Sequence, residues 1–218
     1  MRHTAKGPII AISFFFIIAP LMTTFAQEAA GAPTIDYFEG WVTADGEPVD
    51  FGQPLSPGTL VQVGEGSYCE IIFGGNILRI QENSIATIEI DSRKRKLDLR
   101  FGGVAAVFKK LQTLGGRESF EFRTPTAVGG VRGTTFYIRV EDVSNTYICT
   151  CNGELGLEFP NMHDERQILS AHHTAYRFTR GEGGSISAAS AGLIYHTDEE
   201  MEELASNVDI EIDWSRAE

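Results

Sequence analysis

Residues 120–136 read FEFRTPTAVGGVRGTTF, and this stretch decides the fold. Its first four residues alternate aromatic and charged side chains, as a half-buried β-strand does. Pro125 then ends the strand, because proline has no N–H to donate to a β ladder. The glycines that follow allow positive φ or close approach of the backbone, and a strand resumes at Thr134. The stretch therefore predicts two strands joined by a turn, with Phe136 in the core.

Further short β-like runs lie on both sides of this stretch, separated by turns rich in Gly, Pro, Asn and Asp. They occupy residues 38–42, 59–63, 68–73, 77–80, 86–90, 96–101, 103–108, 134–140, 146–151 and 155–159. Several of them alternate apolar and polar residues, which is typical of strands with one buried face. This spacing predicts an all-β domain over residues 38–180, either a sandwich or a short-stranded, β-solenoid-like fold.

The N-terminal 26 residues indicate a cleaved secretory signal. Arg2 and Lys6 form a basic n-region, and residues 9–19 follow as an uncharged apolar run. That run is too short to span a bilayer comfortably, although an uncleaved anchor is the alternative. We therefore expect the chain to be periplasmic or extracellular, with no membrane span after cleavage.

Small residues at Thr24 and Ala26 fit a signal peptidase site, which makes Gln27 the new N-terminus. Residues 27–37 are small and polar, and we interpret them as a flexible leader. The formal net charge of the chain is −12, which argues against binding to nucleic acid or anionic lipid.

The C-terminal part, residues 181–218, differs in character and is predicted to be a linker with an acidic tail. Residues 181–192 read GEGGSISAASAG, which is typical of a flexible link. Thr197 and Glu200 fit a capping box. We therefore expect one short acidic helix over residues 198–206.

The strand series resembles the FecR domain family of bacterial envelope proteins over residues 58–159. The most specific part is TPTA leading into VRGTTF within residues 124–136. The hallmark positions are Thr124, Pro125, Val131, Arg132, Gly133, Thr134 and Phe136. Nothing in them reads as a nucleophile, base or metal ligand, and Arg132 is better explained as a hydrogen-bond donor holding the turn than as an anion binder. We interpret the hallmark as a fold signature.

The resemblance implies a role in interaction or sensing at the cell envelope. The best-known members are membrane-spanning regulators whose exported domain receives a signal from a partner protein. Here few residues precede the apolar run, so we expect a stand-alone exported domain without a sigma-binding segment. No Ser/His/Asp arrangement or carboxylate pair stands out. We therefore expect a non-enzymatic protein whose partner is an unknown envelope protein or a surface polymer.

Cys149 and Cys151 depart from the family pattern. In the segment TYICTCNG they would share the face opposite Ile148 and Thr150, which we expect to be the more exposed one. Residues two apart in a strand have Cα atoms roughly 6.5–7 Å apart. That separation is near or beyond the limit for an undistorted disulfide. Cys69, by contrast, lies between inward apolar positions and is predicted to be a buried core thiol.

Histidines downstream give the two thiols a second interpretation. Two thiolates with imidazoles from His172, His173 or His196 form a ligand set for zinc or a similar metal. His172 and His173 are adjacent, so in a strand only one of them could join. Such binding would weaken as pH falls, because the thiols must lose their protons. A metal-binding or redox-responsive module is therefore the alternative function, and a strained disulfide, free thiols or packing histidines are the alternatives to it.

Overall fold

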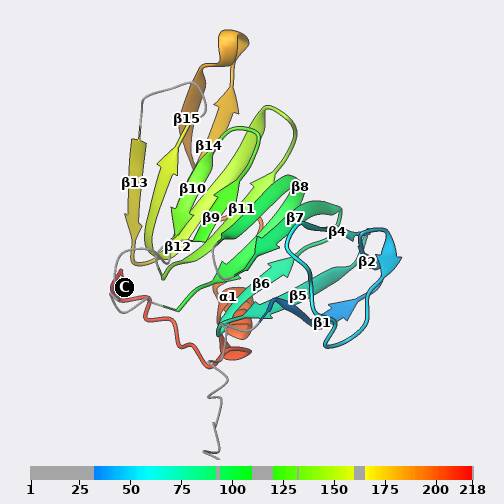
Figure 1. Cartoon of the computed structure of the whole chain (residues 1–218). Helices are drawn as coiled ribbons and strands as arrows, with labels where there is room; N and C mark the ends of the chain where they lie inside the picture. Colours follow the sequence, from blue (N-terminus) through cyan, green and yellow to red (C-terminus); the bar gives the residue numbers. More distant parts are fainter. Residues whose placement is uncertain (1–31, 92–93, 110–119, 132, 160–164, 218) are drawn as a thin grey trace, which may run out of the picture.

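The computed structural model describes residues 32–91, 94–109, 120–131, 133–159 and 165–217 (Figure 1). These residues form β-strands and one short C-terminal α-helix, so the all-β prediction is confirmed. The predicted signal sequence, its cleavage site and Arg132 lie outside the described residues. Within them, no helix combines the length and the apolar character that crossing a membrane requires.

The strands form two sheets, which we call sheet A and sheet B. In spatial order, sheet A contains β1 (Thr34–Glu39), β5 (Tyr68–Phe73), β6 (Asn76–Ile80), the second half of β8 (Arg95–Val107), β11 (Thr135–Val140), the first half of β12 (Asn145–Glu158), β14 (Thr174–Arg180) and β15 (Ile186–Ala191). Sheet B contains β3 (Glu47–Pro48), β2 (Val42–Ala44), β4 (Thr59–Val63), β7 (Ser84–Ile90), the first half of β8, β9 (Phe120–Arg123), β10 (Val128–Val131), the second half of β12 and β13 (Glu165–Ser170).

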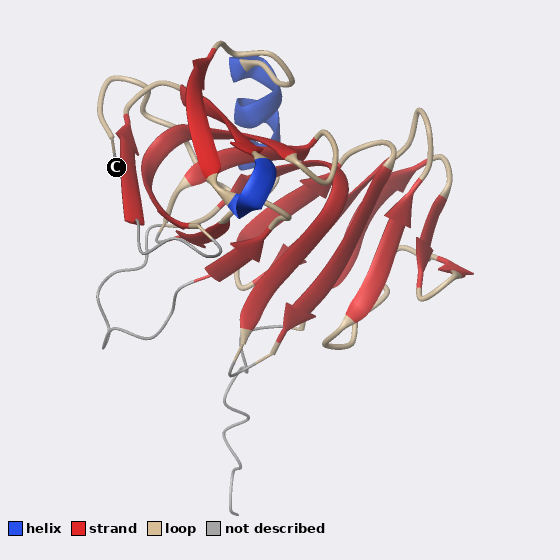
Figure 2. Ribbon diagram, turned by 90° about the horizontal axis from the view of Figure 1, so that it is seen from above, coloured by secondary structure: helices blue, strands red, loops and turns tan. Residues whose placement is uncertain are grey.

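The fold combines features of both predicted architectures. The strand numbers rise along both sheets, apart from β2 and β3, so the chain advances along the sheets as it does in a solenoid (Figure 1). Figure 2 shows the strands lying side by side in a row. Yet the named neighbours pair antiparallel except for β8 and β9, and the two sheets enclose a common core as in a sandwich. Apolar residues on one face of each sheet are buried together, which is the usual reason for two sheets to pack.

Two long strands pass from one sheet to the other, each bending at a glycine. Strand β8 bends at Gly102, where φ is 88°, and β12 bends at Gly153, where φ is 102°. A Cβ at Gly102 would also overlap Ser84. The sequence predicted two separate strands at each place, over 96–101 with 103–108 and over 146–151 with 155–159. That prediction was wrong because a glycine lets one strand turn a corner without breaking it.

The core between the sheets, which we call the inner core, follows the predicted alternation. It contains Phe136, which has no exposed surface and lies beside the rings of Phe108 and Phe122. Cys69 is also fully buried there, and burial raises the pKa of its thiol to about 12. The predictions of a buried Phe136 and of a core thiol at Cys69 are therefore confirmed.

A second apolar cluster, which we call the outer cluster, lies on the other face of sheet A. Helix α1 (Asp198–Ser206) closes it and packs against β6 and β8. The predicted capping box is present, because Thr197 accepts from the Glu200 N–H and the Glu200 carboxylate accepts from the Thr197 N–H. The short C-terminal helix is therefore confirmed with its predicted bounds.

Four other predictions are corrected. Strand β1 begins at Thr34, so residues 34–37 are strand instead of leader. A turn at Gly40, where φ is 77°, interrupts the run predicted over 38–42. The segment predicted as a glycine turn contains strand β10. The predicted link over 181–192 is a hairpin, in which η1 (Glu182–Gly184) turns the chain and β15 pairs with β14. The prediction was wrong because backbone hydrogen bonds form this pair, and a composition rich in glycine and serine does not indicate them.

Candidate metal centre

Strand β12 presents Cys149 and Cys151 on the outer face of sheet A. Their neighbour Ile148 points into the inner core, whereas both cysteines belong to the outer cluster. Residues two apart in a strand share a face, so the predicted common face is confirmed. The predicted exposure is wrong, because neither cysteine has any exposed surface.

The C-terminal segment causes this burial. Helix α1 buries Met201, Leu204 and Ala205 against the cysteine face, and Trp214 packs there from the chain that follows the helix. The alternation within 146–151 could show which residues share a face. It could not show that a helix about 50 residues later would cover that face.

Two histidines approach the thiols from different segments. His173 lies in the turn between β13 and β14, and its Nδ1 is 3.5 Å from the Sγ of Cys149. His196 lies just before α1, and its Nε2 is 3.2 Å from the Sγ of Cys151. The side chain of His196 is buried, with 5% of its surface exposed. The chain thus brings one donor atom toward each sulfur.

The four donor atoms lie close together. All of them lie within 4.8 Å of one another, and the two sulfurs are 3.9 Å apart. Typical zinc bond lengths imply separations of about 3.8 Å between two sulfurs and about 3.6 Å between a sulfur and a nitrogen. The separations of 3.9, 3.5 and 3.2 Å lie close to these values. Cys149, Cys151, His173 and His196 therefore form a closed Cys₂His₂ set.

A carboxylate orients one of the histidines. The Nε2 of His173 is 2.7 Å from Asp198 Oδ1, so its Nδ1 is turned toward Cys149. Metal-binding histidines commonly pair their second nitrogen with a carboxylate in this way. His172 lies outside the four-donor set. It is in the same turn as His173, and its Nε2 lies 2.8 Å from Asp198 Oδ2. Only one of the two adjacent histidines joins the thiols, as expected, although both lie in a turn instead of a strand.

Aromatic rings enclose the donor atoms. The ring of His196 stacks on Tyr137 with centroids 4.5 Å apart, and Trp214 lies 5.1 Å from the ring of His173. Tyr137 is held in place because its hydroxyl donates to Gln81 at 2.5 Å. The Nδ1 of His196 is buried and has no hydrogen-bond partner in the described part of the chain. The walls exclude water, which strengthens electrostatic interactions among the donors.

The two thiols differ in acidity. The hydrogen bond from Cys151, helped by both histidines, outweighs burial and lowers the pKa of Cys149 well below its usual range. Burial raises the pKa of Cys151 well above its usual range. Burial alone would lower the pKa of His173, but Cys149 and Asp198 outweigh it and raise that pKa. Cys149 is therefore favoured as a thiolate, the form that binds metals and reacts.

Cys149, His173 and Asp198 also have the order of a nucleophile, a base and an orienting carboxylate. A nucleophile must meet its substrate, however, and Cys149 has no exposed surface. The grooves of about 360 and 310 Å³ in the described part of the chain are lined by other residues. Such a triad would also leave Cys151 and His196 without a role, whereas a metal would use all four side chains.

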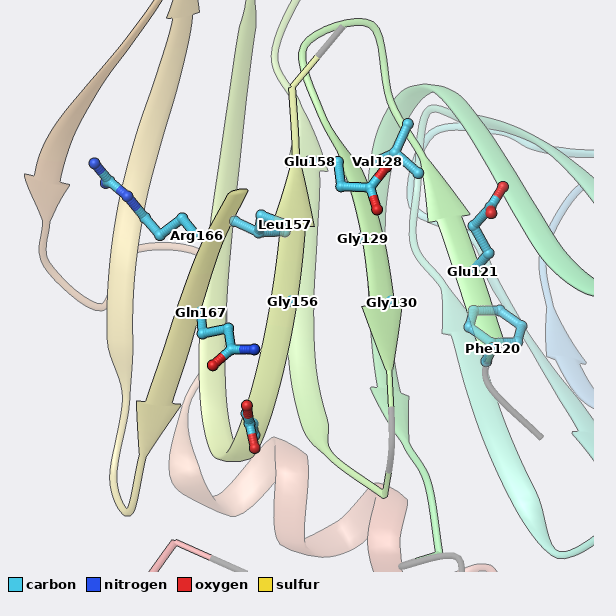
Figure 3. A pocket seen from close by; sticks show the side chains of 11 residues that line it. Phe120, Glu121, Val128, Gly129, Gly130, Gly156, Leu157, Glu158, Arg166 and Gln167 are labelled. Carbon is cyan, nitrogen blue, oxygen red and sulfur yellow. The ribbon is translucent and has the colours of Figure 1, made fainter. Parts of the chain in front are cut away.

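The groove of about 360 Å³ lies on sheet B (Figure 3). Gly130 and Gly156 form part of its floor, and Glu121, Glu158 and Gln167 lie around them on β9, β12 and β13. These side chains offer hydrogen bonds to a polar ligand, but include no nucleophile paired with a base. Sequence reasoning did not single out this groove, because it forms only when β10 and β12 pair.

The described hallmark residues serve the fold. Thr124 closes the turn after β9, because its Oγ1 accepts from the Ala127 N–H at 3.0 Å and donates to the Ala127 carbonyl. Thr134 donates to the carbonyl of Glu154 at 2.6 Å, and Phe136 fills the inner core. Pro125 follows β9, Val131 ends β10 in the inner core, and Gly133 has a positive φ of 64°.

Comparison with known proteins gives one family. A family model described as FecR protein matches residues 59–154. Two crystal structures of a candidate anti-sigma factor from Parabacteroides distasonis are similar, with TM-scores of 0.48 and 0.47 and 13% identity. Each similarity covers 60% of this chain and 59% of the other, so less than two thirds of those chains is matched. No curated protein matches this chain.

Proposed function

Starting from the FecR domain at residues 59–154, we propose that this chain is a non-enzymatic sensing and interaction module of the cell envelope. The family match is the observation that carries the proposal, because FecR domains in known regulators receive a signal from a partner. The chain's hallmark residues support the fold, and its most reactive thiol is enclosed. Both features suit a module that binds and responds better than one that turns over a substrate.

The location proposed for this module is the periplasm or the extracellular space. Support comes from the basic n-region, the apolar run and the small residues before Gln27. N-terminal sequencing of the protein recovered from the envelope fraction should begin at Gln27. Recovery of a chain that begins at Met1 would overturn cleavage and favour the anchored alternative.

The interaction itself is tested by affinity capture. Immobilised chain from Gln27 to Glu218 is incubated with native envelope extract, beside the same chain denatured before coupling. Enrichment of one protein on the native chain, in an amount that rises with the amount of chain immobilised, would support a protein partner. Enrichment of polysaccharide on the native chain would support a surface polymer. Equal retention by native and denatured chain would contradict an interaction module.

A second function is favoured by the Cys₂His₂ set: binding of a zinc-class metal ion. The observation behind it is the convergence of four donor atoms within 4.8 Å of one another. Elemental analysis should find one zinc per mature chain, and none after Cys149→Ser combined with Cys151→Ser. His172→Ala is the matched control, because His172 adjoins the site without belonging to the four-donor set. Equal uptake by wild type and double variant, or none by the reduced wild type, would remove this function and leave a thiol-redox site.

A further inference from the structure

We propose that the metal site is also a latch: its occupancy sets how firmly the C-terminal segment, residues 196–216, covers the outer face of sheet A. The inference rests on the proposed metal binding and adds a conformational output to it. It predicts that loss of the metal loosens this segment while the two-sheet domain stays folded.

The four donors come from two bodies that the latch would join. Cys149 and Cys151 belong to β12 and His173 to the β13–β14 turn, so three donors are fixed to the sheets. His196 alone belongs to the covering segment. A metal ion held by all four would therefore cross-link the cover to the sheet, as structural zinc sites join chain segments that otherwise pack poorly.

A hydrogen bond beside the site also joins the covering segment to the sheets. His196 is followed at once by the N-cap Thr197 and by Asp198, the first residue of α1. Asp198 receives the hydrogen bond of His173, so the covering segment supplies both a donor, His196, and the carboxylate that orients another donor. Ligation would hold the N-terminus of α1 at two adjacent points.

The rest of the cover is attached by the buried side chains of Met201, Leu204 and Ala205 and by individually weak polar contacts. Asn152 donates from Nδ2 to the carbonyls of Asp213 and Arg216 at 2.9 Å each. Arg79 and Glu203 form a partly exposed ion pair at 3.1 Å, of the kind that contributes little to stability. Helix α1 has nine residues, and an isolated helix of that length is marginal in water. The helix depends on its docking, and the metal would strengthen that docking.

The face beneath the helix is apolar. It includes Ile77, Val107 and Tyr137, which are buried in the same cluster as Met201 and Leu204 of α1. Opening the latch would expose this face together with the two thiols. A sensing domain would thereby convert metal occupancy into exposure of a surface, which is a change that another molecule can read.

The test uses the mature chain, residues 27–218, and follows amide hydrogen exchange in residues 197–209. In the wild type, a chelator should raise exchange there at least tenfold, and zinc should restore protection, with no comparable change in β4, β7 and β11. Fluorescence gives a second readout in a Trp41→Phe background, where Trp214 is the remaining tryptophan and lies beside His173.

Three variants identify the cause. His196→Ala removes the donor on the cover and should show high exchange in 197–209 with or without zinc. His196→Cys keeps a zinc ligand there and should restore zinc-dependent protection, which separates ligation from a packing defect. Leu169→Ala, at an exposed position of β13 outside the site, should behave as the wild type. Failure of zinc to bind the wild type would overturn the metal function, whereas binding with unchanged exchange in 197–209 would overturn the latch alone.

Discussion

The inner core and the outer cluster lie on opposite faces of sheet A and differ in chemistry. The inner core is formed almost entirely by apolar side chains of the two sheets. The outer cluster is closed by a helix and contains the two thiols, two buried tyrosines and, beside them, His196. The first is the kind of packing that any two-sheet domain needs. The second buries groups that are expensive to desolvate unless they have partners, which indicates a use beyond packing.

The two clusters also differ in how much of each the FecR match includes. The FecR match ends at residue 154, so it includes most strands of the inner core and both cysteines, but neither His173, His196 nor α1. The complete site therefore requires segments beyond the matched domain. A domain with the same sheets but without this C-terminal cover would lack one of the four donors, His196.

The largest expected effect is in the inner core. Phe136→Ala should lower the free energy of unfolding by roughly 3–5 kcal/mol, as deletion of a buried aromatic ring does. Urea denaturation followed by far-UV circular dichroism measures the loss. Leu169→Ala is the control, because Leu169 is 67% exposed and its loss should have little effect. A loss below about 1 kcal/mol for Phe136→Ala would mean that the inner core does not depend on this ring.

Two adjacent glycines of β10 allow a test of how this strand faces the inner core. A Cβ at Gly129 would overlap the buried ring of Phe122, whereas a Cβ at Gly130 meets nothing within 4 Å. Gly129→Ala should therefore cost about 3 kcal/mol, at the upper end of overpacking effects. Gly130→Ala should be neutral or slightly stabilising. Similar urea midpoints for the two variants would contradict the register of β10 in sheet B.

The inner core could be predicted from the sequence because the alternation of apolar and polar residues within each strand shows which side chains face inward. The alternation in 68–73 and 86–90 places Cys69 and Ile88 inward, and the structure buries both. The bends of β8 and β12 were missed because Gly102 and Gly153 look like turn residues, and composition does not distinguish a turn from a bent strand.

The candidate site could be predicted only in part. The sequence identified Cys149, Cys151 and the histidines as chemically related, and the capping box located α1. It could not choose between His172 and His173, because that choice depends on a turn where His173 has a positive φ of 49°. The sequence also could not predict that the thiols are buried, since the helix that covers them is distant in the chain. Metal binding itself stays a prediction.

An intermediate effect is expected in the outer cluster. Leu204→Ala should weaken the docking of α1 by roughly 2 kcal/mol, at the low end for buried leucines, because a helix that can undock limits the loss. Hydrogen exchange in 197–209 measures it. Since docking and metal binding are linked, zinc affinity should fall by a similar factor although Leu204 is not a ligand. Glu199→Ala, on the exposed side of α1, is the control. Unchanged zinc affinity in Leu204→Ala would separate helix docking from the site.

The smallest effect concerns the cap that connects the site to the helix. Thr197 lies between the donor His196 and Asp198, and its Oγ1 accepts from the Glu200 N–H at 3.2 Å. Thr197→Ala should cost about 1 kcal/mol of helix stability, which is roughly a fivefold loss of exchange protection in 197–209. Thr197→Ser keeps the hydroxyl and should restore protection.

The cap variant also decides whether the two regions unfold separately. If the C-terminal segment opens on its own, Thr197→Ala changes exchange only in 197–209 and leaves the urea midpoint of the sheets in place, because the sheets are already folded when the helix opens. If the whole chain unfolds as one unit, the midpoint falls by the full cost of the cap and exchange rises throughout. The second result would mean that the inner core and the outer cluster are one cooperative structure, and that a metal at Cys149, Cys151, His173 and His196 would stabilise the whole domain instead of acting on its cover.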